Sequence, residues 1–311
     1  MNLTIPTSTM QQRFIELEHC VGNTPLYKIR NLTKNPKVAI YAKLEWLQLG
    51  GSVKARPAYN IMRDAIRNGE ITRERGLLDA SSGNTGIAYA VFAAVSGIPV
   101  TLCLPDNASK ERKTILRNLG VNVIPTSPFE STDGAQNIAK ELSDAEPHKY
   151  FYADQYANAA NWKAHYDGTA EEIWRQTYQQ VTHFISGLGT TGTFTGTGRK
   201  LRELNSNIQL ISLQPDSALH GMEGWKHLET AKVPSIYDDA VANENRTVTT
   251  EEAYQTMIDA AKHEQLLLSP SAAANLAGAL RLANELEEGT IVTIFADDAS
   301  KYSEVLKHLN L

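Results

Sequence analysis

The chain has 311 residues, of which 42% are hydrophobic and 21% are charged, with a formal net charge of −5. This composition is typical of a globular protein, and the length suits about two domains of ~150 residues each. No apolar run approaches the ~20 residues of a membrane span, and the scattered basic residues lack interleaved aromatics. Membrane and nucleic acid are therefore unexpected partners.

The cysteine and histidine content bears on the cellular compartment and on whether a metal site is expected. Two cysteines cannot build a disulfide framework, and the first twelve residues lack the basic and apolar regions of a secretory signal. These features predict a cytoplasmic protein. The eight histidines show no zinc-site spacing, so no catalytic metal is expected.

Short apolar strands alternate with helical periods along the chain. The predicted strands are Val38–Glu45, Leu77–Ala80, Val100–Leu104, Val121–Pro125, Thr182–Ser186, Ile208–Leu213 and Ile291–Phe295. The predicted helices are Ala58–Asn68, Gly86–Ser96, Lys110–Leu119, Ala170–Gln179, Thr193–Leu204, Glu251–His263, Ala272–Glu287 and a last one from Tyr302. This alternation predicts an α/β fold with mainly parallel, covered sheets. The weakly periodic segment Gln214–Asn245 is predicted to be a long functional loop.

Lys54 stands directly before a predicted helix, after the sequence Leu-Gly-Gly-Ser-Val. The positive end of a helix dipole disfavours an ammonium group by roughly 0.3–1 kcal/mol. It therefore favours the neutral amine, which attacks carbonyls and forms Schiff bases. Taken alone, Lys54 is more simply explained as an exposed lysine near a loop. Two glycine-rich loops favour a functional role for Lys54 over this simpler explanation.

The first loop, Ser81–Gly86, joins a strand to a helix and consists of small or polar residues, which suits a carboxylate or phosphate. The second, Gly187–Thr193, has the pattern G-x-G-x-x-G, and Asp216 ends the next strand. A nicotinamide dehydrogenase therefore remains an alternative. Against it, three threonines in this loop suit a single terminal phosphate. Ser269-Pro-Ser271, taken alone, is explained as a helix N-cap followed by proline.

The order and residue content of these motifs resemble those of the fold-type II pyridoxal phosphate enzymes. Within that group they resemble the cysteine synthases (O-acetylserine sulfhydrylases), nearest the B type. The resemblance covers almost the whole chain. It rests on the motifs Gly22–Leu26, Gly51–Lys54, Ser81–Gly86, Asp154–Asn158 with His165-Tyr166 and Glu172-Ile-Trp174, Gly189–Thr193 and Leu213–Asp216.

The resemblance implies a pyridoxal 5'-phosphate cofactor and two domains, each a twisted, mainly parallel sheet flanked by helices. Residues 48–158 would form a smaller substrate-loop domain, and residues 1–47 plus 159–311 a larger domain that binds the cofactor phosphate. Lys54 would form the Schiff base and then carry the Cα proton. The other implied ligands are Asn84 for the ring hydroxyl, Ser81, Ser82, Gly83, Thr85 and Gln155 for the substrate carboxylate, Gly189, Thr190, Thr191, Gly192 and Thr193 for the phosphate, and Ser269 for the ring nitrogen.

The implied activity is that of a transferase of cysteine biosynthesis, which converts O-acetyl-L-serine and sulfide to L-cysteine and acetate by β-elimination and addition. A homodimer that partners with serine acetyltransferase is expected. Three alternatives stay open. They are another acceptor, as in a cystathionine β-synthase, O-phosphoserine as the donor, and a low-activity paralogue that acts by binding a partner.

Several positions depart from the family pattern. Ala55 follows the lysine where an acid is usual, Pro270 and Ser271 stand in the S-S-G-A-A motif, and Ala296–Lys301 differs near the C-terminus. The segment Gly221–Trp225 lacks the arginine pair of B-type enzymes, and Glu223 would repel dianionic donors. Its two glycines predict a lid that closes over the substrate.

Overall fold

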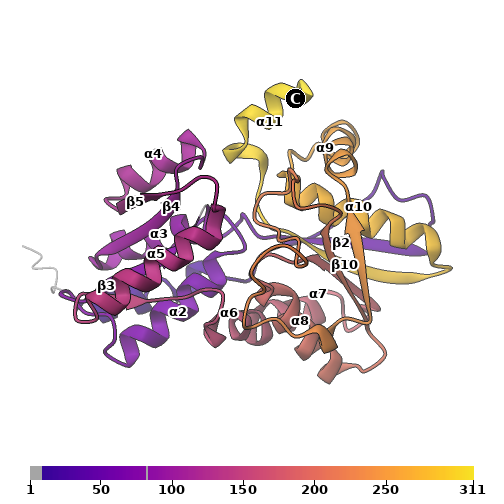
Figure 1. Cartoon of the computed structure of the whole chain (residues 1–311). Coiled ribbons are helices and arrows are strands. Elements are labelled where there is room, and N and C mark those ends of the chain that lie inside the picture. Colours follow the sequence, from indigo (N-terminus) through magenta and orange to yellow (C-terminus); the bar gives the residue numbers. More distant parts are fainter. Residues whose placement is uncertain (1–8, 82) are drawn as a thin grey trace, which may run out of the picture. The chain divides into compact units, whose positions relative to one another are not determined.

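The computed structural model describes residues 9–81 and 83–311, so Ser82 lies outside the described residues. The chain divides into two compact units, Met1–Val21 with Ala58–Asp154 and Gly22–Pro57 with Gln155–Leu311. Each unit contains its own sheet flanked by helices (Figure 1), which confirms the predicted α/β fold. Within the described ranges, no helix is long and apolar enough to cross a membrane.

The smaller unit is built on a four-stranded parallel sheet of order β5-β4-β3-β6. Its strands are β3 (Gly76–Ala80), β4 (Val100–Pro105), β5 (Asn122–Thr126) and β6 (Tyr150–Tyr152). Its helices are α1 (Met10–Ile15), most of α2 (Ala55–Arg67), α3 (Asn84–Ser96), α4 (Lys110–Asn118) and α5 (Ser131–Ala145). Every residue of β3 and β4 is buried, which explains why both strands are mostly apolar, with Asp79 and Thr101 as the polar exceptions.

The larger unit is built on a six-stranded sheet of order β1-β2-β10-β7-β8-β9, in which only β1 runs antiparallel to its neighbour. Its strands are β1 (Leu26–Lys28), β2 (Val38–Leu44), β7 (His183–Gly187), β8 (Gln209–Pro215), β9 (Glu244–Val248) and β10 (Gly289–Phe295). Its helices are α6 (Ala159–Ala164), the π-helix η2 (His165–Thr169), α7 (Ala170–Gln176), α8 (Gly192–Leu204), α9 (Thr250–Glu264), α10 (Pro270–Glu285) and α11 (Ser303–Leu309). Helices α9 and α10 cover one face of the sheet, and α7 and α8 cover the other (Figure 1).

The boundaries of the two units differ from those expected. Phe14 stacks on Tyr59 with ring centroids 4.9 Å apart and meets Phe92 edge-on at 6.2 Å, so α1 belongs to the smaller unit and not to the larger one. Residues 48–57 belong to the larger unit, because the backbone N–H of Val53 donates to the carbonyl of Ala296 at 2.8 Å. The aromatic contact between an N-terminal helix and α3 has no local signature in the sequence.

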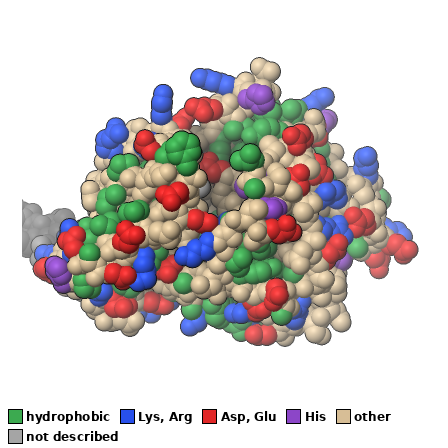
Figure 2. Space-filling model, in the orientation of Figure 1, with side chains coloured by type: hydrophobic (Ala, Val, Ile, Leu, Met, Phe, Trp, Pro, Cys, Tyr) green, Lys and Arg blue, Asp and Glu red, His purple; other side chains and the backbone are tan. Residues whose placement is uncertain are grey.

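The surface carries charges of both signs. On the face shown in Figure 2, Lys and Arg side chains alternate with Asp and Glu and with apolar groups. A cationic stripe of the kind that binds nucleic acid is not visible on this face.

Candidate functional site

The predicted loops of the larger unit meet at one edge of its sheet. Strands β2, β10, β7 and β8 are mutually parallel, so their carboxyl ends lie at the same edge. The segment with Lys54 follows β2, the segment Ala296–Tyr302 follows β10, and Leu188–Thr191 follows β7. In open α/β sheets, ligands bind in the crevice beyond this edge.

Lys54 is held by the segment that follows β10. In addition to the bond between Val53 and Ala296, Lys301 Nζ donates to the carbonyl of Gly51 at 3.2 Å. Burial lowers the pKa of Lys54, and the charge of the fully buried Asp297 opposes this only in part. Asp297 itself accepts from the Tyr302 hydroxyl at 3.0 Å. The neutral amine predicted from the sequence is thus favoured, chiefly by burial.

Thr191, in the predicted phosphate loop, has a strained backbone and an unused hydroxyl. Its φ of +72° is left-handed, a conformation that a β-branched residue avoids at a cost of about 1–3 kcal/mol. It is the N-cap of α8, but its side chain makes no capping bond. Within the described part of the chain, Thr191 Oγ1 is buried without a hydrogen-bond partner. Glycine would relieve the strain, so the hydroxyl is what the threonine adds.

This loop fits a phosphate group. The first N–H groups of a helix have no intrahelical partner and favour an anion. The N-terminus of α8 offers such groups beside the Thr191 hydroxyl. A buried donor without a partner is costly unless a ligand satisfies it. The described residues therefore provide donors for a terminal phosphate at the edge where Lys54 lies.

The segment Gly221–Trp225 packs against this loop. A Cβ atom at Gly187 would lie 1.9 Å from the Trp225 ring, and one at Gly189 would lie 2.1 Å from the Gly224 carbonyl oxygen. Met222 is fully buried and Trp225 is 9% exposed. Opening of this segment would expose both side chains, and its role as a lid stays a prediction. Gly187 and Gly189 allow this close packing.

Asn161 joins two of the predicted ligand segments. Its Nδ2 donates to the carbonyl of Gln155 at 2.6 Å and to Thr190 Oγ1 at 3.1 Å, and the side chain is 1% exposed. No role for Asn161 was predicted from the sequence. Its position shortly after the Asp154–Asn158 motif is the signal that the sequence offers, since its burial is known only from the structure.

Ser269 is the N-cap of α10 and is fully buried. Its Oγ accepts from the N–H of Ala272 at 3.2 Å and lies 3.3 Å from Ser271 Oγ. Because the oxygen accepts the capping bond, its own proton can be donated either to Ser271 Oγ or to a ring nitrogen. The bridge between Leu268 and Asp298 places Ser269 beside the segment that follows β10.

In the smaller unit, the predicted carboxylate loop follows β3 and leads into α3. Ser81 Oγ accepts from the N–H groups of Gly83 at 3.2 Å and Gly86 at 3.0 Å, so this side chain shapes the loop. Thr85 is buried, whereas Asn84 is half-buried. Arg112, from α4, packs against the loop and would lie 3.2 Å from a Cβ at Gly83. The structure thus groups Ser81, Gly83, Asn84 and Thr85 in one unit, and Lys54, Gln155, Gly189–Thr193 and Ser269 in the other.

Four buried charges surround the first turn of α2. Arg56 donates to Glu45 at 2.6 Å and to Glu172 at 2.7 Å, and Lys43 donates to Glu172 at 2.6 Å. Burial alone would raise the pKa of Glu172, but hydrogen bonds and charge from Arg56, together with Lys43, lower it to about 2. The cluster is neutral overall and fixes the helix that begins after Lys54.

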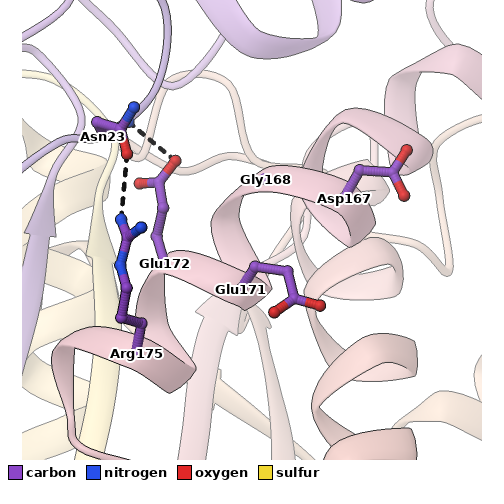
Figure 3. Close-up of a pocket in the computed structure, with 6 residues that line it drawn as sticks. All are labelled: Asn23, Asp167, Gly168, Glu171, Glu172 and Arg175. Carbon is purple, nitrogen blue, oxygen red and sulfur yellow. Dashed lines mark hydrogen bonds between the residues drawn. The ribbon is translucent and has the colours of Figure 1, made fainter.

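A pocket of about 250 Å³ opens onto this cluster. Figure 3 shows Glu172 pointing toward Asn23, whose N–H donates to its carboxylate at 2.9 Å, and Arg175 donating to the Asn23 side chain at 3.1 Å. Asp167 and Glu171 form other parts of its wall. None of the predicted ligand residues lines this pocket.

Comparison with known proteins places these features in a family. Residues 17–297 match the family described as pyridoxal-phosphate dependent enzyme. The cysteine synthase of Aquifex aeolicus is 45% identical over 91% of this chain and 88% of that protein. Cysteine synthase B of Pseudomonas aeruginosa is 37% identical over 94% and 97%. The solved structure of the O-acetylserine dependent cystathionine beta-synthase from Helicobacter pylori superposes with a TM-score of 0.86 at 32% identity, and the match covers 96% of this chain and 98% of that chain.

Proposed function

We propose that this chain, which belongs to the pyridoxal-phosphate dependent enzymes, is a cysteine synthase that uses O-acetyl-L-serine and sulfide. The family assignment makes pyridoxal phosphate the cofactor and rejects the nicotinamide dehydrogenase alternative. The relatives named cysteine synthase match both units, which supports a β-replacement reaction on an activated serine.

The observation that carries the proposal is the pairing of Thr191 with Lys54 at one sheet edge. Thr191 offers a buried donor in a strained loop, and Lys54 offers an amine whose pKa is lowered by burial. A phosphate anchor and a neutral amine are the two requirements for holding pyridoxal phosphate.

When bound, pyridoxal phosphate supplies an electron sink for breaking the Cα–H bond and expelling a β-substituent. The N-terminus of α8, with Gly189, Thr190, Thr191, Gly192 and Thr193, would hold its phosphate. Ser269 would donate to the ring nitrogen and Asn84 would bind the ring hydroxyl. A hydroxyl leaves that nitrogen unprotonated, which favours elimination over transamination.

Side chains and backbone groups of the chain would bind the substrate carboxylate, and one base would transfer the Cα proton. Gly83, Thr85 and the side chain of Gln155 would bind the substrate carboxylate, together with Ser81, whose hydroxyl proton is not used in shaping the loop. Lys54 Nζ would take the Cα proton and return it after a sulfur nucleophile has added to Cβ. Because burial lowers the pKa of Lys54, its amine is suited to act as a base.

The direct test is turnover by the purified holoenzyme with O-acetylserine and sulfide, read as cysteine formed. A rate near ~10 s⁻¹, the median for enzymes, is expected. O-phosphoserine and serine as donors are the comparison arms. Cysteine formation from neither O-acetylserine nor these donors would reject the proposal and favour a low-activity paralogue that binds a partner.

A second candidate is the same β-replacement with homocysteine as acceptor. It is favoured by the TM-score of 0.86 to the O-acetylserine dependent cystathionine beta-synthase. Competition between sulfide and homocysteine at equal concentrations separates the two, because the product is cysteine in one case and cystathionine in the other. We further propose a cytoplasmic homodimer that binds serine acetyltransferase, and sedimentation with and without that enzyme tests both associations.

A further inference from the structure

The imidazole of His165 lies between two threonine hydroxyls. Its Nδ1 is 2.9 Å from Thr169 Oγ1, and its Nε2 is 3.3 Å from Thr193 Oγ1. His165 is 1% exposed and Thr169 is fully buried, so water does not compete for the contact at Nδ1, whereas Thr193, at Nε2, is half-buried. Both residues belong to the π-helix η2, while Thr193 belongs to the first turn of α8.

The direction of these two hydrogen bonds follows from the charge beside Thr193. A neutral imidazole has one N–H and one acceptor nitrogen, so the two bonds must run in the same sense. If Nε2 accepted from Thr193, the hydroxyl would present lone pairs to a phosphate dianion. If Nε2–H donates instead, the Thr193 proton is left to point at the anion. The second arrangement requires Nδ1 to accept from Thr169.

Given the proposed phosphate site, we propose that His165 is a positioning residue for the cofactor phosphate, fixed by Thr169 as the Nε2–H tautomer and thereby directing the Thr193 hydroxyl proton toward the phosphate. Hydrogen bonds in such a chain polarise one another, which strengthens the last bond, the one to the anion. Thr169 would thus act on the phosphate through two intervening groups.

The surroundings of His165 keep it neutral, as this relay requires. Burial lowers the pKa of His165 well below its ordinary value, and the charges of Arg56 and Lys54 lower it further, against an opposing effect of Glu172. A protonated imidazole would donate from both nitrogens and would no longer depend on Thr169.

The test is the rate at which pyridoxal phosphate leaves the holoenzyme, followed by its capture by an apo-protein acceptor. Thr193→Val and Thr169→Val are both expected to raise this rate about tenfold, since each weakens a bond to a charged group. Thr195→Val and Thr197→Val are the matched controls. Both threonines are fully buried in α8, and within the described chain their hydroxyls have no hydrogen-bond partner. Neither control is expected to change the rate.

Nitrogen NMR of ¹⁵N-histidine-labelled holoenzyme gives a readout that a merely structural role would not produce. The His165 signals, assigned by their loss in His165→Gln, are expected to show a protonated Nε2 and a bare Nδ1. His165→Gln, which keeps a donor near the Nε2 position, should release the cofactor more slowly than His165→Phe.

The outcomes separate this relay from the proposed function. Faster release in Thr193→Val with no change in Thr169→Val would overturn the relay and leave the phosphate site standing. No change in either variant would remove Thr193 from the phosphate site and the relay with it. A protonated Nδ1 in the holoenzyme would overturn the relay whatever the release rates are.

Discussion

The backbone N–H of Val53 donates to the carbonyl oxygen of Ala296 at 2.8 Å, which ties the residue before Lys54 to the end of the central strand β10. The segment Ala296–Lys301 departs from the family pattern, yet it carries both this contact and the bond from Lys301 to Gly51. The departure therefore leaves the lysine anchored, and we expect it to change the surroundings of the cofactor ring more than the position of Lys54.

Lys54→Ala should reduce turnover by at least ~10²–10⁴-fold, the usual effect of losing a general base, because the variant also loses the attachment point for the cofactor. Turnover with O-acetylserine and sulfide measures this effect. Lys34→Ala, at an exposed position, is the control and should behave as wild type. Activity above about one-hundredth of wild type in Lys54→Ala would refute the assignment.

Substitutions of Thr191 should change protein stability and cofactor binding in opposite directions. Thr191→Gly is expected to stabilise the cofactor-free protein by about 1 kcal/mol, because the relief of about 1–3 kcal/mol of strain exceeds the added chain entropy of about 0.4–1 kcal/mol. It should nevertheless weaken cofactor binding, as should Thr191→Val, while Thr191→Ser retains it. Chemical denaturation and cofactor titration measure the two effects. Unimpaired binding in both Thr191→Gly and Thr191→Val would show that the hydroxyl has no ligand.

Glu172 should make folding stability depend on pH in the acid range. Its pKa falls from an ordinary value of 4.5 to about 2 in the folded protein, so its contribution, about 3 kcal/mol, is complete above pH 4.5 and is lost as the pH falls toward 2. Glu172→Gln should lower the unfolding free energy at pH 7 by about 3–5 kcal/mol, since Arg56 and Lys43 lose a buried partner.

Denaturation of Glu172→Gln between pH 7 and pH 2 checks this prediction, because the difference from wild type should shrink as the pH falls. Glu171→Gln is the matched control. Glu171 is the adjacent residue on α7 and its side chain is 47% exposed, so its pair with Lys200 should contribute no more than about 1 kcal/mol. A constant difference across the pH range would mean that Glu172 does not titrate differently in the folded state.

Gly187 and Trp225 should be energetically coupled. Gly187→Ala places a methyl group 1.9 Å from the Trp225 ring, so the ring must move and the larger unit should lose stability. Trp225→Leu removes the obstacle and loses burial of its own. In a double-mutant cycle, the combined variant should be more stable than the sum of the single effects by about 0.5–3 kcal/mol. Additive free energies of unfolding would show that the ring already has room.

The parallel strands could be predicted from the sequence, because they have local signatures, as do the loops at their ends, whose ligand roles stay predictions. β3 and β4 are mostly apolar, and the loops that follow β2, β3 and β7 carry small polar residues in fixed order. Helix α5 was not predicted, since its buried positions include the small residues Ala135 and Ala139, which give a weak apolar period. Strand β6 was not predicted either, because its three residues are too few to show an alternating pattern.

The polar residues that contact the predicted ligand residues could not be predicted from local sequence patterns. Asn161, His165 and Asp297 act through partners that are distant in sequence, such as Thr190, Thr193 and Lys54. Their spacing along the chain carries no information about those contacts. The lid stays a prediction for a related reason, because a Cβ at Gly221 would lie 2.5 Å from the Tyr254 hydroxyl and Gly224 has a φ of +90°, and a local pattern does not distinguish these needs from hinge flexibility.

The π-helical turn His165–Thr169 gives this stretch one residue more than α-helical winding would hold. Each residue of an α-helix advances the side-chain direction by about 100°, so deleting Asp167 would turn α7 relative to α6 by roughly that angle. Glu172 would then point away from Arg56 while His165 stayed beside Thr193. The extra residue therefore sets the rotation of α7 relative to α6. It allows His165 to contact Thr193 in the phosphate loop while Glu172 contacts Arg56 in the helix that follows Lys54.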